Sequence, residues 1–217
     1  MSGMSEIEML IFDLDGTLVD TRRAISDAVN YTLREMGKKE LSFEKILSYI
    51  GGPLENLMEK VLETKNIEEI KKGGDIFNSY YKKNSKEKVK LYPHVKQTLQ
   101  HFSHKKKALV TNASEKMAMM TLEHFKIKGY FEKIFTGDEE NCVKPSACPI
   151  NRTREYLKAC SRNSLMIGDM AVDIEAGRKA GIKTCGVTYG IGKEEEIRKA
   201  SPDFIINDIA ELKDIVK

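Results

Sequence analysis

The stretch MLIFDLDGTLVDT, residues 9–21, places two aspartates, Asp13 and Asp15, directly after a short apolar run. An apolar run followed by a glycine turn predicts a buried strand over residues 7–12. A carboxylate at the end of a buried strand costs free energy unless it is paired, hydrogen-bonded or bound to a metal. Side chains alternate along a strand, so both aspartates face the same side, and Gly16 lets the chain turn beside them. The pair therefore indicates a functional site.

The sequence after this strand is helical for about seventy residues. Residues 21–39 carry apolar side chains at i, i+3, i+4 and i+7 spacing, and Gly37 stands where a C-terminal glycine belongs. Further helices are predicted over residues 42–49 with Ser42 as cap, from Pro53 onward, and, after a break at Gly73 and Gly74, through Phe77, Tyr80 and Tyr81. We therefore expect residues 20–90 to form an all-helical domain.

From Leu91 onward, strand-like and helix-like segments alternate. The predicted strands are KALVTN (107–112), EKIFTG (132–137), SLMIGD (164–169), IKTCGVT (182–188) and DFIIN (203–207). Such alternation implies right-handed crossovers and a parallel sheet with helices on both faces. The predicted fold is α/β: a doubly wound, Rossmann-like parallel-sheet core, residues 1–19 and 91–217, with the helical domain inserted after the first strand.

Composition excludes several classes of protein. The 36 basic and 33 acidic residues nearly balance, which leaves no electrostatic footprint for nucleic acid. No apolar run reaches the roughly eighteen residues of a membrane span, and the N-terminal residues MSGMSEIE lack the features of a signal peptide. We expect a cytoplasmic protein with neither a nucleic-acid nor a membrane partner. Without a C-x-x-C pair or zinc-ligand spacing, we also expect unpaired, reduced thiols at Cys142, Cys148, Cys160 and Cys185.

Open parallel sheets bind ligands beyond the carboxyl ends of their strands, and polar residues gather there in this sequence. They are Asp13, Asp15, Thr111, Asn112, Lys144 and Asp169, with Asp173 one helical turn later. Clustered carboxylates in a partly buried cleft need a cation, and hard oxygen ligands suit Mg²⁺. The Lys144 charge, the Thr111 hydroxyl and the backbone N–H groups of Gly16, Thr17 and Asn112 can cradle a phosphoryl group. This predicts metal-assisted phosphoryl transfer to an aspartate.

Four motifs carry a resemblance to a known family. D-x-D-G-T at residues 13–17, Thr111 in VTN, Lys144 before a proline, and G-D-x-x-x-D at residues 168–173 occur in this order. Together they resemble the haloacid dehalogenase superfamily of phosphatases, whose helical cap domain would match residues 20–90. DGTLVDT and GGPLENL are most similar to its phosphoglycolate phosphatase-like members. Two departures are His94, where the family usually has glycine, and Ala147, where a second proline is common.

The resemblance implies a role for each matching residue. Asp13 would attack phosphorus and form an aspartyl-phosphate, and Asp15 would protonate the leaving alcohol and later deprotonate water. Thr111 would bind phosphoryl oxygens, and Lys144 would offset negative charge. The implied Mg²⁺ ligands are the Asp13 carboxylate, the Asp15 backbone carbonyl and Asp169, while Asp173 would orient Lys144 or a metal-bound water.

The expected activity is Mg²⁺-dependent hydrolysis of a small phosphorylated metabolite, a phosphomonoester similar to phosphoglycolate. An inorganic pyrophosphatase or a sugar-phosphate mutase of the same superfamily are alternatives. A phospho-aspartate receiver domain is a different class, but no suitable aspartate ends the middle strands and a helical insert has no place there. A non-catalytic module would have lost catalytic positions, and none is lost. In the cap, residues 48–56 could face the substrate, Arg22 and Arg23 could meet an anionic tail, and Asp20 and Tyr92 mark a hinge.

Overall fold

The computed structural model describes residues 7–139, 141–160 and 163–216. A six-stranded sheet, all of whose pairings are parallel, lies at its centre in the order β5-β4-β1-β6-β7-β8. Its strands are β1 (Met9–Phe12), β4 (Lys106–Val110), β5 (Lys133–Phe135), β6 (Ser164–Gly168), β7 (Lys183–Val187) and β8 (Phe204–Ile206). The chain winds outward from β1 first through β4 and β5, then through β6, β7 and β8. The crevice at the carboxyl end of β1, between β4 and β6, is thus the switch point where such sheets bind ligands.

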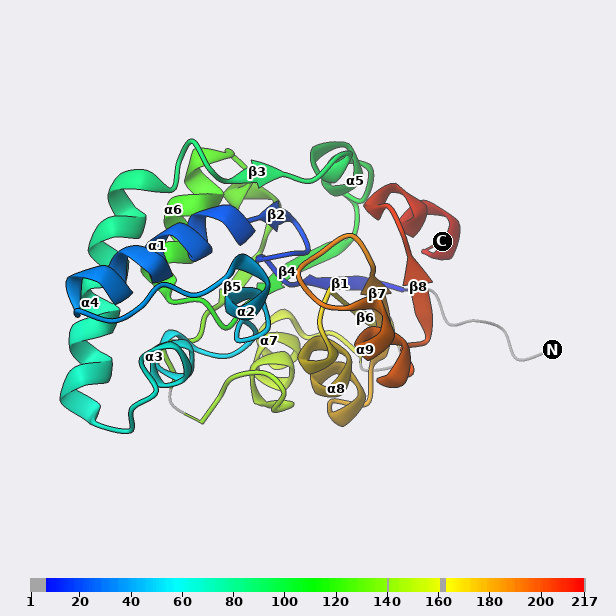
Figure 1. Cartoon of the computed structure of the whole chain (residues 1–217). Coiled ribbons are helices and arrows are strands. Elements are labelled where there is room, and N and C mark those ends of the chain that lie inside the picture. The colour runs from blue at the N-terminus through cyan, green and yellow to red at the C-terminus, as the bar shows by residue number, and fades with distance from the viewer. Residues whose placement is uncertain (1–6, 140, 161–162, 217) are drawn as a thin grey trace.

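Alternate side chains of β1 enter two apolar cores on opposite faces of the sheet. Leu10 and Phe12 belong to one core, and Met9 and Ile11 belong to the other. Burial on both faces explains why the strand reads as a continuous apolar run. The flanking helices are α5 (Val95–His101), α6 (Glu115–His124), α7 (Cys148–Leu157), α8 (Ala171–Lys179), α9 (Glu194–Lys199) and α10 (Leu212–Ile215), with 3₁₀ turns η1 (Lys128–Tyr130) and η3 (Ile209–Glu211). In Figure 1, α7 and α8 lie on one side of the sheet and α5 on the other, which confirms the predicted doubly wound core.

Four helices lie between β1 and Leu91, and most of this segment is on one side of the sheet (Figure 1). They are α1 (Arg22–Glu35), α2 (Phe43–Leu47), α3 (Leu54–Leu62) and α4 (Ile67–Asn84). Two short strands, β2 (Val19–Asp20) and β3 (Lys90–Leu91), pair antiparallel where the chain leaves and re-enters the core. This paired crossing supports our proposal that residues 20–90 form a cap domain hinged at β2 and β3.

The predicted helix break at Gly73 and Gly74 is wrong, because α4 runs through both residues without interruption. A Cβ atom at Gly73 would lie 2.7 Å from Leu62 Cδ1 and 3.3 Å from Met58 Sδ. The glycine therefore lets α4 pack closely against α3. Tertiary packing outweighs the low helix propensity of the glycine pair, which costs roughly 1 kcal/mol per residue relative to alanine.

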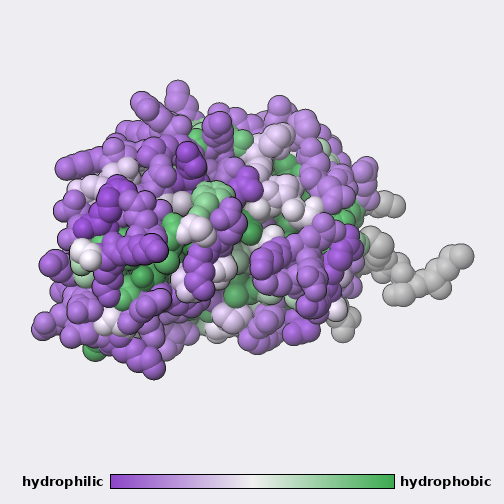
Figure 2. Space-filling model, in the orientation of Figure 1, coloured by the Kyte–Doolittle hydropathy of each residue, from purple (hydrophilic) through white to green (hydrophobic). Residues whose placement is uncertain are grey.

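Figure 2 shows that hydrophilic side chains cover most of one face of the molecule, with apolar residues in small patches between them. Among the residues that the structure describes, no helix has the length and apolar character needed to cross a membrane.

Candidate active site

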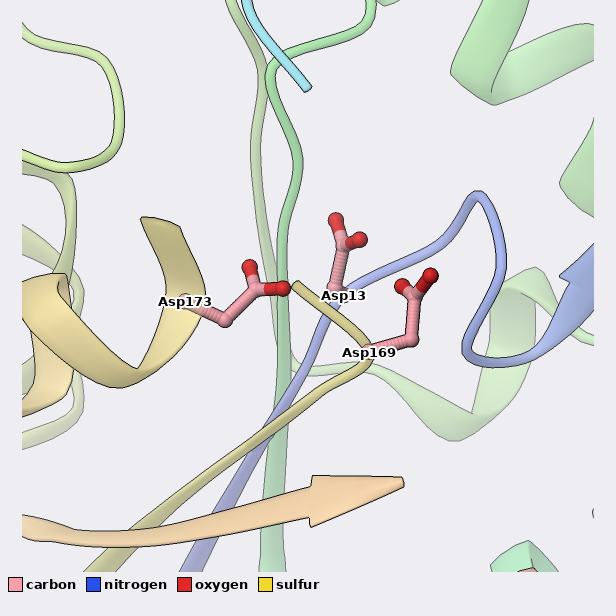
Figure 3. Close-up of side chains that lie close together, drawn as sticks. All are labelled: Asp13, Asp169 and Asp173. Atoms are coloured by element: carbon pink, nitrogen blue, oxygen red, sulfur yellow. The ribbon is translucent and has the colours of Figure 1, made fainter. Parts of the chain in front are cut away.

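Three buried carboxylates meet at the carboxyl end of the sheet. Asp13 follows β1, Asp169 follows the neighbouring β6, and Asp173 lies in the first turn of α8. One carboxylate oxygen from each lies within 4.8 Å of the others, and Figure 3 shows Asp13 between the other two. Three negative charges this close strongly disfavour one another unless cations or protons compensate them.

Asp169 is held by hydrogen bonds to both of its carboxylate oxygens. The Thr17 hydroxyl donates to Oδ1 over 3.0 Å, and the Ile191 N–H donates to Oδ2 over 2.7 Å. The turn at Gly16 approaches the same carboxylate: its φ is +86°, and a Cβ there would lie 2.2 Å from Asp169 Oδ2. Only glycine can adopt this positive φ freely and also leave room for the Asp169 carboxylate, which explains the glycine in the sequence DGT.

Lys144 is the cation that faces these carboxylates. It lies between β5 and α7 and is buried, with Nζ 2.7 Å from Asp13 Oδ1 and 2.6 Å from Asp173 Oδ1. The second oxygen of Asp173 accepts the Met170 N–H over 3.0 Å, so this residue also stabilises the start of α8. The expected contact between Asp173 and Lys144 is thus present in the structure.

Asn112 fixes the loop that carries Lys144. Its Oδ1 accepts the Lys144 N–H, and its Nδ2 donates to the Lys144 carbonyl, each over 2.9 Å. The same Nδ2 also donates over 2.9 Å to the carbonyl of Gly51, in the loop before α3. The Asn112 side chain therefore connects the end of β4, the loop that carries Lys144 and the loop before α3.

Burial and mutual repulsion perturb the acids of the site. Burial is the main cause that raises the pKa of Asp169 to about 7, and the Asp173 charge adds to it. Burial also raises the pKa of Asp13 well above its usual range, against the attraction of Lys144, and it raises the pKa of Asp15. Burial disfavours the charged form of Lys144, but the charges of Asp13 and Asp173 outweigh it and raise the pKa of Lys144. The single positive charge of Lys144 is too small to compensate the carboxylates of Asp13, Asp169 and Asp173.

A divalent cation would supply the missing charge, and the donors fit Mg²⁺. Asp13, Asp169 and Asp173 offer carboxylate oxygens on one side of the crevice, as a hard cation requires. One lysine against three carboxylates leaves an excess of negative charge that a divalent ion can balance. The ligand assignment itself remains a proposal.

A cavity of about 80 Å³ is lined by Asp13, Asp173 and Lys144, whereas Asp169 is not among its lining residues. Six predicted site residues line it: Asp13, Asp15, Thr111, Asn112, Lys144 and Asp173. Gly16 and Thr17 do not line it; their N–H groups donate to the carbonyls of Val19 and Leu14 over 2.8 and 3.3 Å. In this structure the backbone donors of these two residues are therefore engaged within the turn.

Sequence reasoning missed three residues of the helical segment 20–90 that line the cavity. Ile25, Leu57 and Phe77, from α1, α3 and α4, line the cavity together with residues of the loop 48–56 that we expected to face the substrate: Ile50, Gly51 and Gly52. In the sequence these apolar residues are indistinguishable from core positions. Neither Arg22 nor Arg23 lines the cavity, which fits the exposure that is the default for arginines on a helix rather than contact with a substrate tail. Arg22 pairs with Asp20 at 2.7 Å, and Arg23 is largely exposed beside Asp27.

The expectation of four unpaired thiols is wrong for two of them. Cys142 and Cys148 form a disulfide, with Cα atoms 5.2 Å apart, and the loop that it closes contains Lys144. The five intervening residues match no common cysteine motif, but the loop folds back to the start of α7 and brings the two residues within bonding distance. Cys160, which is exposed, and Cys185, which is buried, are free as expected.

Comparisons with known proteins agree with this geometry. A family model described as haloacid dehalogenase-like hydrolase matches residues 10–187. A protein of Aquifex aeolicus named phosphoglycolate phosphatase is 35% identical over 208 residues, which cover 95% of each chain. One of Oceanobacillus iheyensis named pyrophosphatase PpaX is 31% identical over 212 residues, covering 97% of each. A crystal structure described as a predicted phosphoglycolate phosphatase from Haemophilus somnus has a TM-score of 0.92 at 27% identity, covering 98% of this chain and 99% of that one. The chain therefore belongs to the haloacid dehalogenase-like hydrolase family.

Proposed function

We propose that this enzyme is a Mg²⁺-dependent phosphatase that hydrolyses small phosphomonoesters through an aspartyl-phosphate. The observation that carries the proposal is the position of Asp13: its carboxylate lines a cavity, 2.7 Å from a buried lysine and one residue removed from a second acid, Asp15. A nucleophile beside a cation and a separate proton carrier are what two-step phosphoryl transfer requires.

In the first step, an Asp13 oxygen forms a bond to phosphorus while the bond from phosphorus to the leaving oxygen breaks. Asp15 gives its proton to that oxygen, so the product leaves as an alcohol. In the second step, Asp15 takes a proton from water as the water oxygen attacks phosphorus, and Asp13 is released with inorganic phosphate. The raised pKa of Asp15 suits both roles, because an acid–base catalyst works best with a pKa near the working pH.

The other residues bind and orient. Lys144 neutralises charge on Asp13 and on the phosphoryl oxygens, and the Thr111 and Asn112 positions bind those oxygens. Asp13, the Asp15 carbonyl and Asp169 would hold Mg²⁺, with Asp173 beside them; the ion supplies positive charge at the phosphoryl oxygens when bound. The proposed cap, residues 20–90, closes over the cavity and excludes water from the first step.

The test is phosphate release from a panel of compounds, with Mg²⁺ and with EDTA. The panel contains phosphoglycolate, sugar phosphates, p-nitrophenyl phosphate and pyrophosphate. We expect release from monoesters that requires Mg²⁺ and is absent in the Asp13→Asn variant. No release from any compound in the presence of Mg²⁺ would contradict the proposal.

Pyrophosphate hydrolysis is a second candidate, favoured by the similarity to the relatives named pyrophosphatase PpaX. Release from pyrophosphate that exceeds release from every monoester would establish it instead. Transfer of the phosphoryl group within a sugar phosphate, without free phosphate, would indicate a mutase.

A further inference from the structure

The wall that faces the catalytic groups across the cavity is apolar. Five side chains from the segment 20–90 contribute to it: Ile25, Ile50, Leu54, Leu57 and Phe77. From the core, Met117, Met170 and Val172 line the same space. A phosphoryl group bound to Asp13 and Lys144 would direct the rest of the substrate toward these side chains.

Charged groups in the cavity all belong to the phosphoryl end. They are Asp13, Asp15, Asp173 and Lys144, and Lys144 is the single cation among the described residues that line it. Lys144 already contacts two carboxylates, at 2.7 and 2.6 Å. A negative charge on the leaving group would therefore lie in a buried, apolar space without a positive partner, which is costly.

The adjoining space offers no cation either. A second cavity shares Leu54, Asn112 and Ser114 with the first and continues outward between the loop before α3 and the loop after β5. Its charged lining residues within the described part of the chain are acidic: Glu55, Asp138 and Glu139. Glu139 is paired with Arg152, so an anionic substrate extended in this direction would meet repulsion from Glu55 and Asp138.

One polar group remains free on the wall. The Ser114 hydroxyl oxygen is buried and has no hydrogen-bond partner among the described residues. Ser114 as a residue lines both cavities, so a ligand in either lies near this side chain. A buried hydroxyl without a partner costs free energy that a ligand hydroxyl or amide would recover.

We propose that the substrate's leaving group is short, uncharged and mainly apolar, with room for one hydroxyl or amide beside Ser114. The inference rests on the proposed phosphatase function and narrows its substrate class. The cavity volume of about 80 Å³ corresponds to about five to eight water-sized groups, since one water needs roughly 10–15 Å³ of such space. The phosphoryl group takes a large part of this volume, so a longer leaving group would have to extend into the acidic second cavity.

The test compares two compounds of the same shape: phosphoglycolate, whose tail is a carboxylate, and glycolamide phosphate, whose tail is a neutral amide. At pH 7.5 with Mg²⁺, we expect kcat/KM at least about tenfold higher for the amide, because the buried carboxylate stays unpaired. Equal or better turnover of phosphoglycolate would overturn the inference.

Two variants test the cause. Leu54→Lys places an ammonium group at the wall and should reduce the preference for the amide at least about threefold. Ile67→Lys adds the same charge at a position that is 80% exposed and outside the cavity lining, and should leave the preference unchanged. An equal change in both variants would show that the general field of the protein, not the wall, sets the preference.

Binding separates a failure of this inference from a failure of the proposed function. If wild-type protein releases no phosphate from either compound or from p-nitrophenyl phosphate, the phosphatase proposal fails. Calorimetric binding of the same two compounds to the Asp13→Asn variant with Mg²⁺ tests separately whether the apolar wall disfavours an anionic tail. Tighter binding of the amide supports this, and tighter binding of phosphoglycolate, or binding of neither compound, overturns it.

Discussion

Replacing Lys144 by methionine removes the cation of the site while nearly preserving side-chain volume. Each of its two contacts, at 2.7 and 2.6 Å, corresponds to about 6 kcal/mol of attraction at an effective dielectric constant of about 20, much of which burial of the ammonium offsets. Loss of one member of a buried ion pair usually costs about 3–5 kcal/mol, because the remaining charge stays buried without a partner. We expect Lys144→Met to lower the free energy of unfolding by that amount at pH 8 without Mg²⁺.

The pH dependence distinguishes loss of charge from loss of packing. Asp13 and Asp169 have pKa values raised in the folded protein, so their protonated forms favour folding, and that contribution disappears as pH rises through the raised values. In the variant the carboxylates repel one another fully at pH 8 but take up protons by pH 5. The loss should therefore shrink at pH 5 to the about 1 kcal/mol or less of a volume-conserving substitution.

The assay is urea unfolding of wild type and variant at both pH values in EDTA. Lys199→Met is the control, since Lys199 forms an exposed i, i+4 pair with Glu195 and should contribute about 0.5 kcal/mol or less at either pH. A loss of equal size at pH 5 and pH 8 would refute the reasoning, because it would mean that Lys144 stabilises by packing alone. Mg²⁺ at pH 8 should restore part of the stability of the variant.

Three further outcomes follow from the site. Asp13→Asn should abolish turnover and leave the circular dichroism spectrum unchanged; substantial residual activity would mean that another group is the nucleophile. Asp15→Asn should lower kcat by at least about 10²-fold while Mg²⁺ affinity, measured by calorimetry, is retained. Protons should compete with the metal, because the pKa of Asp169 is about 7: the apparent Mg²⁺ affinity should fall about tenfold from pH 8 to pH 6, and a constant affinity would exclude Asp169 as a ligand.

Local sequence rules were sufficient for the core of the fold. The apolar run of β1, the strand–helix alternation after Leu91 and the Ser42 cap, whose Oγ accepts the Lys45 N–H over 3.2 Å, all depend on residues close in sequence. The meeting of Asp13, Asp169 and Lys144 was also predictable, because the carboxyl ends of parallel strands share one edge. His94 stands where related sequences usually have glycine. It adopts φ +61°, a conformation that favours glycine, and its Nδ1 lies 2.7 Å from Asp208 Oδ2.

What could not be predicted depends on contacts between distant segments. The continuity of α4 at Gly73 follows from its distance to Leu62, and the pairing of Cys142 with Cys148 follows from the path of one loop. The apolar cavity wall is a further case, since Leu57 and Phe77 have the helical spacing of ordinary core residues. Periodicity identifies the buried face of a helix but does not say whether a core or a ligand covers it.

The Asn112 amide has a consequence for the order of events during turnover. Two of its hydrogen bonds hold the Lys144 loop, and a third reaches Gly51 in the proposed cap. Lifting the cap breaks only the third, whose two groups then bond to water, at a net cost of about 1 kcal/mol. If the proposed cap opens in this way, the two remaining bonds would keep Lys144 in place, and the reacting groups would need no reorganisation when a substrate arrives. Entry of the substrate would then not require the catalytic groups to be assembled anew. Opening of the cap could be fast while Lys144 stays fixed.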